Sequence, residues 1–129
     1  MSGSALQRWH AFAESGDVGL LDDLLADDVE FHPPTYWKPR RGKAVVTIIL
    51  GTVATVFEEF RYEREWIDGP NWALEFTARV GELDLKGVDL IRLDEQGKIA
   101  DFEVAARPPN AVAALRDAME ERLRPFLEG

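Results

Sequence analysis

The acidic residue Asp89 lies in a segment, 83–93, in which apolar and polar residues alternate. Successive side chains of a β-strand point to opposite faces, so Asp89 shares a face with Leu85 and Ile91. A carboxylate among apolar side chains must find a partner, stay protonated or face a cavity. The sequence therefore predicts a general acid or hydrogen-bond donor in a pocket, or else a structural carboxylate paired with an arginine or with backbone amides.

The second candidate for chemistry is His32, which ends a short strand expected over 29–32 and precedes Pro33. Imidazole has an ordinary pKa of about 6.5, so it can act as a general base near neutral pH. A pair of His32 and Asp89 across one pocket would suit proton transfer between two carbons of an apolar ligand. The other interpretation is a histidine that hydrogen-bonds to the backbone of the following loop.

Large aromatic side chains are candidates for contacting a flat apolar ligand, although aromatics at strand or helix spacing also build ordinary cores. Trp37 falls in a proline-bounded loop, 33–42, and is expected to cover the pocket. An alternative is a pocket filled by its own side chains, which would leave a purely structural dimer. The predicted ligand-binding residues are Trp9, Trp37, Phe57, Trp72, Phe76 and Phe102.

Composition narrows the classes of function. The net charge of −9 argues against nucleic acid and against anionic membranes as partners. There is no cysteine, which excludes disulfides and thiolate sites. Two histidines make a dedicated transition-metal site unexpected, so we predict neither a metal nor a cofactor. Residues 1–4 lack a basic region followed by an apolar run, so no signal peptide and a cytoplasmic location are expected.

The 129 residues suit a single domain, 1–129. The apolar run 44–57 is too short for the ~20 residues that span a bilayer. Its apolar residues recur at three- and four-residue steps, which favours a buried helix, with a buried strand as the competitor. The expected helices are 5–14, 17–25, 44–57 and 110 to about 125, and the expected strands are 29–32, 60–67, 72–80, 83–93 and 99–107.

This order, ααβαββββα, predicts an α+β fold and not a parallel sheet, because the last four strands follow one another through short turns. A strongly twisted, mainly antiparallel (mixed) sheet can curl around the long helix. Sheet and helix then form a cone with one open end, which is a usual place for a ligand.

Three segments carry a family resemblance: Gly16-Asp17 before the second helix, 27–33 after it, and 87–99, which reads GVDLIRLDEQGKI. With the element order, they resemble the nuclear transport factor 2-like (SnoaL-like) superfamily, over nearly the whole chain. The resemblance implies a cystatin-like cone. It also implies an activity such as steroid isomerisation, polyketide cyclisation or epoxide hydrolysis, or a non-catalytic role. Dimers through the outer sheet face are common in that superfamily.

The isomerase pattern of that superfamily can be placed on three positions. Trp9 stands where those enzymes have a tyrosine, and His32 where they have the basic aspartate. Asp89 stands where they have a protonated aspartate that donates a hydrogen bond. The aspartate that cyclases and epoxide hydrolases carry on the last strand falls at Val104. One of the three isomerase groups therefore matches.

The sequence thus predicts a homodimeric domain that binds a small apolar or aromatic molecule. If it is an enzyme, it is a cofactor-independent isomerase or cyclase, with His32 as base and Asp89 as acid or oxyanion donor. The alternative is a ligand-binding or interaction module without chemistry.

Overall fold

A computed structural model of the chain describes residues 4–128, so residues 1–3, on which the expectation of no signal peptide partly rests, lie outside the described part. The fold is α+β, with the predicted order of elements and one added two-residue strand. The elements are α1 Ala5–Ser15, the 3-10 helix η1 Val18–Leu21, β1 Leu25–His32, β2 Arg40–Arg41, α2 Lys43–Val56, β3 Glu58–Asp68, β4 Asn71–Val80, β5 Leu83–Leu93, β6 Ile99–Arg107 and α3 Pro109–Glu128.

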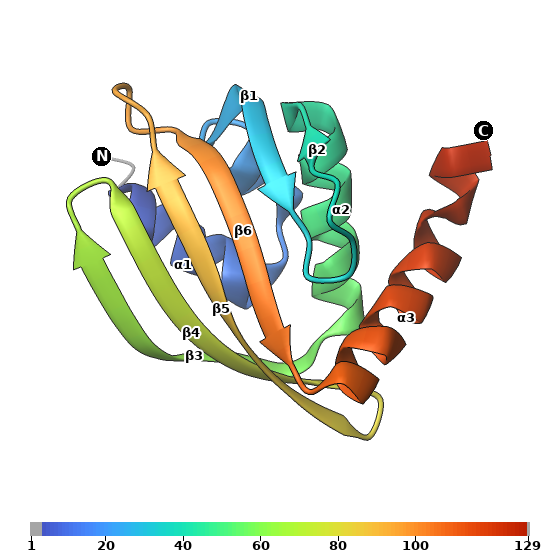
Figure 1. Cartoon of the computed structure of the whole chain (residues 1–129). Helices are drawn as coiled ribbons and strands as arrows, with labels where there is room; N and C mark the ends of the chain where they lie inside the picture. The colour runs from blue at the N-terminus through green and yellow to red at the C-terminus, as the bar shows by residue number, and fades with distance from the viewer. Residues whose placement is uncertain (1–3, 129) are drawn as a thin grey trace.

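The strands form one curved, open, mixed sheet in the order β2-β1-β6-β5-β4-β3. The pair β1–β6 is parallel, and the other neighbours are antiparallel. Helices α1 and α2 lie behind the sheet, and α3 rises beside α2 from the end of β6 (Figure 1). The curved sheet wrapped over a long helix confirms the predicted cone architecture.

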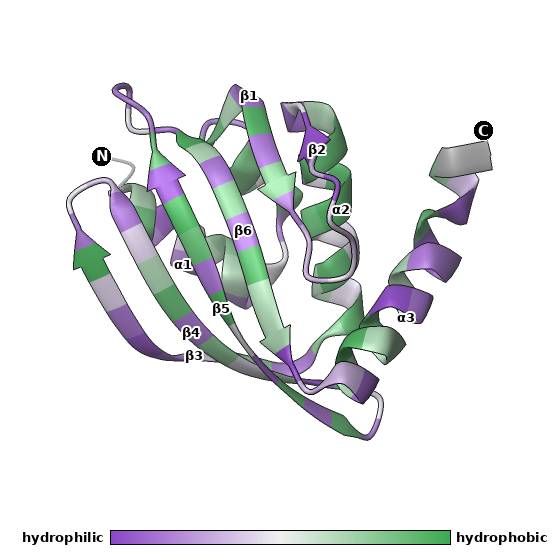
Figure 2. Cartoon of the chain, in the orientation of Figure 1, coloured by the Kyte–Doolittle hydropathy of each residue, from purple (hydrophilic) through white to green (hydrophobic). Residues whose placement is uncertain are grey.

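Alternation along the strands explains which face is covered, and Figure 2 shows it as bands of opposite hydropathy on β5 and β6. On β5, Leu85 and Ile91 are buried, whereas Lys86 and Leu90 are exposed. Apolar side chains gather on the helix side because each Å² of apolar surface buried there stabilises the folded state by about 25 cal/mol. The alternation thus decides for each strand residue whether its side chain faces the helices or the solvent.

The apolar segment after the proline-rich loop is a helix, α2, which resolves the competition with a buried strand. Val46 and Leu50, four residues apart, are buried against the sheet side. At Gly51 a Cβ atom would lie 2.6 Å from Val18, so the absent side chain lets η1 approach α2 closely. No helix within residues 4–128 combines the length and the apolar character needed to cross a bilayer.

Three predicted boundaries are wrong. The helix expected over 17–25 shrinks to η1, because Leu25 already joins β1 and pairs with Ile99 of β6. The loop 33–42 contains β2, which pairs with β1. Helix α3 continues through Pro125 to Glu128, since a proline near a helix end removes a single backbone hydrogen bond there.

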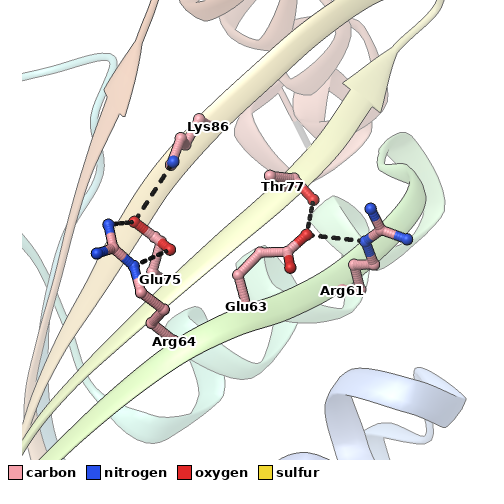
Figure 3. Close-up of polar contacts among 6 residues, drawn as sticks. All are labelled: Arg61, Glu63, Arg64, Glu75, Thr77 and Lys86. Carbon is pink, nitrogen blue, oxygen red and sulfur yellow. Dashed lines mark hydrogen bonds and ion pairs between the residues drawn. The ribbon is translucent and has the colours of Figure 1, made fainter.

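The outer face of the sheet carries ordered polar contacts between β3, β4 and β5 (Figure 3). Glu75 is buried and accepts two hydrogen bonds from Arg64, at 2.8 and 2.6 Å, and Lys86 lies 3.5 Å from the same carboxylate. Arg64 holds the pKa of Glu75 down at about 2 through these hydrogen bonds. Beside them, Glu63 accepts hydrogen bonds from Arg61 and from Thr77. These contacts pair the carboxylates with basic or hydroxyl side chains on the sheet face that is turned away from the helices.

Candidate functional site

A cavity of about 880 Å³ opens between the inner face of the sheet and helices α1, α2 and α3. Its walls come from two core clusters, one around Trp9 and Phe102 and one around Phe76 and Leu115. The cavity therefore lies between the two clusters, where their side chains leave a gap. The aromatic residues of its wall are Trp9, Phe12, Phe31, Tyr36, Phe57, Phe60, Tyr62, Phe76, Phe102 and Phe126.

Asp89 lines this cavity and is 5% exposed. It lies in the middle of β5, between Leu74 of β4 and Val104 of β6 in the sheet register. The predicted strand phase is therefore what turns the carboxylate inward. Gly87, two residues earlier on the same face, leaves room for the ring of Phe76, because a Cβ there would lie 2.6 Å from that ring.

Asp89 is held by a chain of two hydrogen bonds. The Tyr62 hydroxyl donates to Asp89 Oδ2 at 2.5 Å, and the Trp9 indole Nε1–H donates to the Tyr62 oxygen at 2.7 Å. The phenol is satisfied as donor and as acceptor, so its orientation is fixed. Within residues 4–128, no side-chain hydrogen bond reaches the other carboxylate oxygen, Asp89 Oδ1.

The protonation of these groups follows from burial. Burial raises the pKa of Asp89 from an ordinary 3.8 to about 7, against a smaller lowering by the Tyr62 hydrogen bond. Burial, together with the charge of Asp89, raises the pKa of Tyr62 well above 10. At neutral pH the carboxyl group is thus poised between its two forms, while the phenol stays protonated.

The remaining charged side chains around the cavity are exposed and lie at its rim: Glu14, Arg40, Glu59 and Glu120. Tyr36, from the loop before β2, donates a hydrogen bond to Glu120 of α3. This contact joins the loop to the last helix across the mouth. Among the described residues that line the cavity, Asp89 is therefore the single buried carboxyl group.

The expectation that His32 faces Asp89 across the cavity is wrong. His32 follows Phe31, which points inward, so the alternation of β1 turns the imidazole to the outer face of the sheet. There its Nε2 lies 3.2 Å from Glu30 Oε1 and 3.2 Å from Asp101 Oδ1. The structure does not bring the two predicted catalytic residues together.

The six predicted ligand-binding residues divide into three groups. Trp9, Phe57, Phe76 and Phe102 line the cavity. Trp72 is buried in the core beneath it and does not reach the cavity wall. Trp37 is 97% exposed, so the prediction that it covers the pocket is wrong, and Tyr36 beside it lines the mouth instead.

Sequence reasoning missed Tyr62. Its signal was present, because Tyr62 shares a strand phase with Phe60, and both prove to face the cavity. Trp9 has no hydroxyl, and its indole N–H donates a hydrogen bond to the Tyr62 hydroxyl on β3. A β-bulge between Tyr62 and Glu65 shifts the phase of the rest of the strand, which hid the pattern.

A second hollow of about 840 Å³ lies on the side of β3, β4 and β5 near Arg61, Arg79 and Lys86. Its wall is largely charged, and Asp89 is not part of it. The buried, titratable group therefore belongs to the apolar cavity, which is the candidate site.

Comparison with known proteins agrees with this architecture. The model of a family described as the SnoaL-like domain matches residues 6–102, which is most of the chain and includes Trp9, Tyr62 and Asp89. No curated protein matches the chain.

Two solved structures resemble the chain over nearly its full length, and a third resembles it over most of its length. An uncharacterised bacterial protein with a cystatin-like fold from Silicibacter pomeroyi DSS-3 is 50% identical, with a TM-score of 0.91 over 96% of this chain and 90% of that one. A steroid delta-isomerase from Pseudomonas aeruginosa is 45% identical, with a TM-score of 0.91 over 97% of this chain and 93% of that one. An NTF2-like protein of unknown function from Mesorhizobium loti shares the fold at 15% identity, with a TM-score of 0.73 over 81% and 88%.

Proposed function

The chain belongs to the SnoaL-like domain family, and we propose that its cavity binds a small apolar or aromatic molecule on which Asp89 moves a proton. The reaction class is a cofactor-independent isomerisation or cyclisation. One observation carries the proposal: a single buried carboxyl group, with a pKa of about 7, stands in the wall of an apolar cavity. A group with that pKa is suited to both accept and return a proton near neutral pH.

In this proposal the ionised Asp89 takes a proton from a carbon next to a carbonyl group of the ligand. It then returns the same proton to a second carbon, so that a double bond moves and no other reactant is consumed. Tyr62 keeps its proton throughout, because its pKa lies well above the working range. Its hydrogen bond holds the carboxylate in place and lowers the cost of ionising it inside the cavity.

The relative from Pseudomonas aeruginosa, described as a steroid delta-isomerase, supports a flat fused-ring ketone as the first ligand class to test. Aromatic walls such as Phe57 and Phe102 suit a rigid apolar skeleton. A cavity of about 880 Å³ falls within the range of small-molecule sites.

A second candidate function is ligand binding without chemistry. It is favoured by the position of His32, which leaves the cavity without the separate base that the sequence suggested. In that case the protonated Asp89 donates a hydrogen bond to a polar group of the bound molecule. The same cavity and the same residues serve both candidates, so only turnover separates them.

The deciding experiment incubates the protein with a β,γ-unsaturated steroid ketone and follows the ultraviolet absorbance of the conjugated product. We expect turnover that Asp89→Asn abolishes and that the matched variant Asp68→Asn, on an exposed stretch of β3, retains. Binding of the ketone by calorimetry without any product would select the non-catalytic candidate. Absence of both binding and product across a panel of apolar ketones and aromatics would overturn the proposal.

We also propose a homodimer through the outer face of the sheet. Two large apolar side chains stand exposed on that face, Trp66 at 51% and Leu90 at 42%. Light scattering after gel filtration should give twice the mass of one chain, and Leu90→Arg should shift it to the monomer. A cytoplasmic location remains a prediction from the sequence.

A further inference from the structure

We infer that Glu30, His32 and Asp101 form a binding site for a divalent first-row transition-metal ion on the outer face of the sheet. Among the residues that the structure describes, these three form the one group of three or more histidine, cysteine, aspartate or glutamate side chains whose ligand atoms all lie within 4.8 Å of one another. The site lies on the side of the sheet opposite to the cavity, so it is independent of the chemistry proposed for the cavity.

The backbone places the three ligands. Glu30 and His32 are two residues apart on β1, so they point to the same face. Asp101 is the register partner of Glu30 on the parallel strand β6. Pairing of two neighbouring strands therefore holds three ligands together without any loop. Pro33 directly after His32 limits the freedom of the strand end.

The distances suit a shared cation. Nitrogen and oxygen ligands lie about 2.0–2.2 Å from Zn²⁺, so two ligands of one ion are about 3.0–3.5 Å apart. His32 Nε2 is 3.2 Å from Glu30 Oε1 and 3.2 Å from Asp101 Oδ1. The two carboxylate oxygens thus approach the same ring nitrogen at the spacing that a coordinated ion requires.

A single N–H proton on His32 Nε2 does not make good hydrogen bonds to both carboxylates. A ring nitrogen carries one N–H and directs it along one line, so it makes one good hydrogen bond. The contact with Asp101 has hydrogen-bond geometry. The equally close Glu30 Oε1 is within ion-pair distance only. A cation between the three atoms would satisfy both carboxylates together.

Charge and surroundings agree with a divalent ion. Two carboxylates and a neutral imidazole offer two negative charges, and Arg41 holds the other oxygen of Glu30 through its Nε at 3.0 Å. An outer partner of this kind orients a metal ligand. The three side chains are 29–37% exposed, which leaves room for water to complete the coordination. A nitrogen ligand selects zinc, cobalt or nickel over magnesium and calcium.

The test is titration of the full chain with Zn²⁺ by calorimetry, and with Co²⁺ by its visible spectrum. We expect one ion per chain, and loss of that binding in His32→Ala and in Asp101→Asn. The matched control is His10→Ala, since His10 is the other histidine and pairs with a single carboxylate, Glu65, at 2.6 Å. It should bind as the unaltered chain does.

Thermal unfolding gives a second measurement, because an ion that binds only the folded chain raises its melting temperature. Zn²⁺ should raise it in the unaltered chain and in His10→Ala but not in Asp101→Asn. Failure of the unaltered chain to bind either ion, loss of binding in His10→Ala, or unchanged binding in both His32→Ala and Asp101→Asn would each overturn the inference. Circular dichroism of each variant verifies that it is folded.

Discussion

The hydroxyl of Tyr62 lies 2.5 Å from Asp89 Oδ2, although β4 separates the strands that carry the two residues. The phenol reaches across Phe76, its register partner on β4, toward a stretch of β5 where Gly87 has no side chain. A hydrogen bond from a neutral phenol stabilises the ionised carboxylate more than the protonated one. The contact therefore offsets part of the rise in the Asp89 pKa that burial causes.

Tyr62→Phe should raise the pKa of Asp89 above its value of about 7, because the ring remains while the donor is lost. A hydrogen bond to a charged group contributes ~1.5–3 kcal/mol, which corresponds to a rise of about one to two pH units. Carbon-13 NMR titration of the aspartate carboxyl groups measures it. Tyr36→Phe at the cavity mouth is the control and should leave the Asp89 titration unchanged. A fall of the Asp89 pKa in Tyr62→Phe would contradict the role assigned to the phenol.

Asp89 should make the folded state less stable as pH rises. Between about pH 4 and pH 7 the unfolded chain has released the Asp89 proton while the folded chain keeps it, so the free energy of unfolding falls as pH rises. The full effect is about 4 kcal/mol at about 1.4 kcal/mol per pH unit. Asp89→Asn removes this pH dependence. The free energy of unfolding of the variant should therefore match that of the unaltered chain near pH 4 and exceed it above pH 7.

Urea unfolding at a series of pH values measures this difference. Asp68→Asn is the control, because Asp68 is exposed at the end of β3. The free energy of unfolding of this variant should not gain on that of the unaltered chain as pH rises from 4 to 7. A constant difference between Asp89→Asn and the unaltered chain from pH 4 to pH 8 would show that Asp89 titrates as an exposed carboxyl group.

Phe57→Ala should weaken binding of an apolar ligand, whereas Trp37→Ala should not. Phe57 lines the cavity beside Phe76, at 5.8 Å between ring centroids, while Trp37 is 97% exposed and outside the cavity wall. Loss of one aromatic contact of about 1.4 kcal/mol corresponds to a tenfold increase in Kd. Calorimetry with the ligand found for the cavity gives both values. A larger effect from Trp37→Ala would mean that the loop closes over the ligand.

Gly87→Ala should destabilise the fold by about 1–3 kcal/mol, because the added methyl group has no space. It would lie 2.6 Å from the Phe76 ring and 2.7 Å from the carbonyl oxygen of Ala105. Phe76→Leu shortens the side chain in the way, so the double variant should lose less stability than the sum of the two single ones. Chemical denaturation of the four proteins measures the coupling, and strict additivity would place the strain elsewhere.

Glu75→Gln should destabilise the chain at neutral pH and have little effect near pH 2. The pKa of Glu75 is lowered to about 2 by Arg64, so the ion pair contributes stability above the ordinary carboxyl pKa and loses it as pH falls toward 2. Thermal melts at pH 7 and pH 2 test this, with Glu82→Gln in the turn before β5 as control. An equal loss at both values would assign the effect to packing.

Much of the fold follows from local patterns in the chain. Alternation over 83–93 determined that Asp89 points inward, and spacing of apolar residues determined the long helix now seen as α2. The same alternation would have turned His32 outward, since Val29 and Phe31 are the apolar members of its strand. Its expected place in the pocket came from family resemblance, and the strand phase proved the better guide.

The side chains that surround those residues come from distant parts of the chain. Trp9 and Tyr62 are 53 positions apart, and Tyr62 and Asp89 are 27 apart, so no local pattern encodes their hydrogen bonds. The approach of Asp101 to His32, 69 positions away, likewise depends on the parallel pairing of β1 with β6. A periodicity fixes which face a side chain takes because it arises from backbone geometry within a few residues. The partner that it meets on that face depends on how distant strands come together, and this is settled only when the whole chain packs.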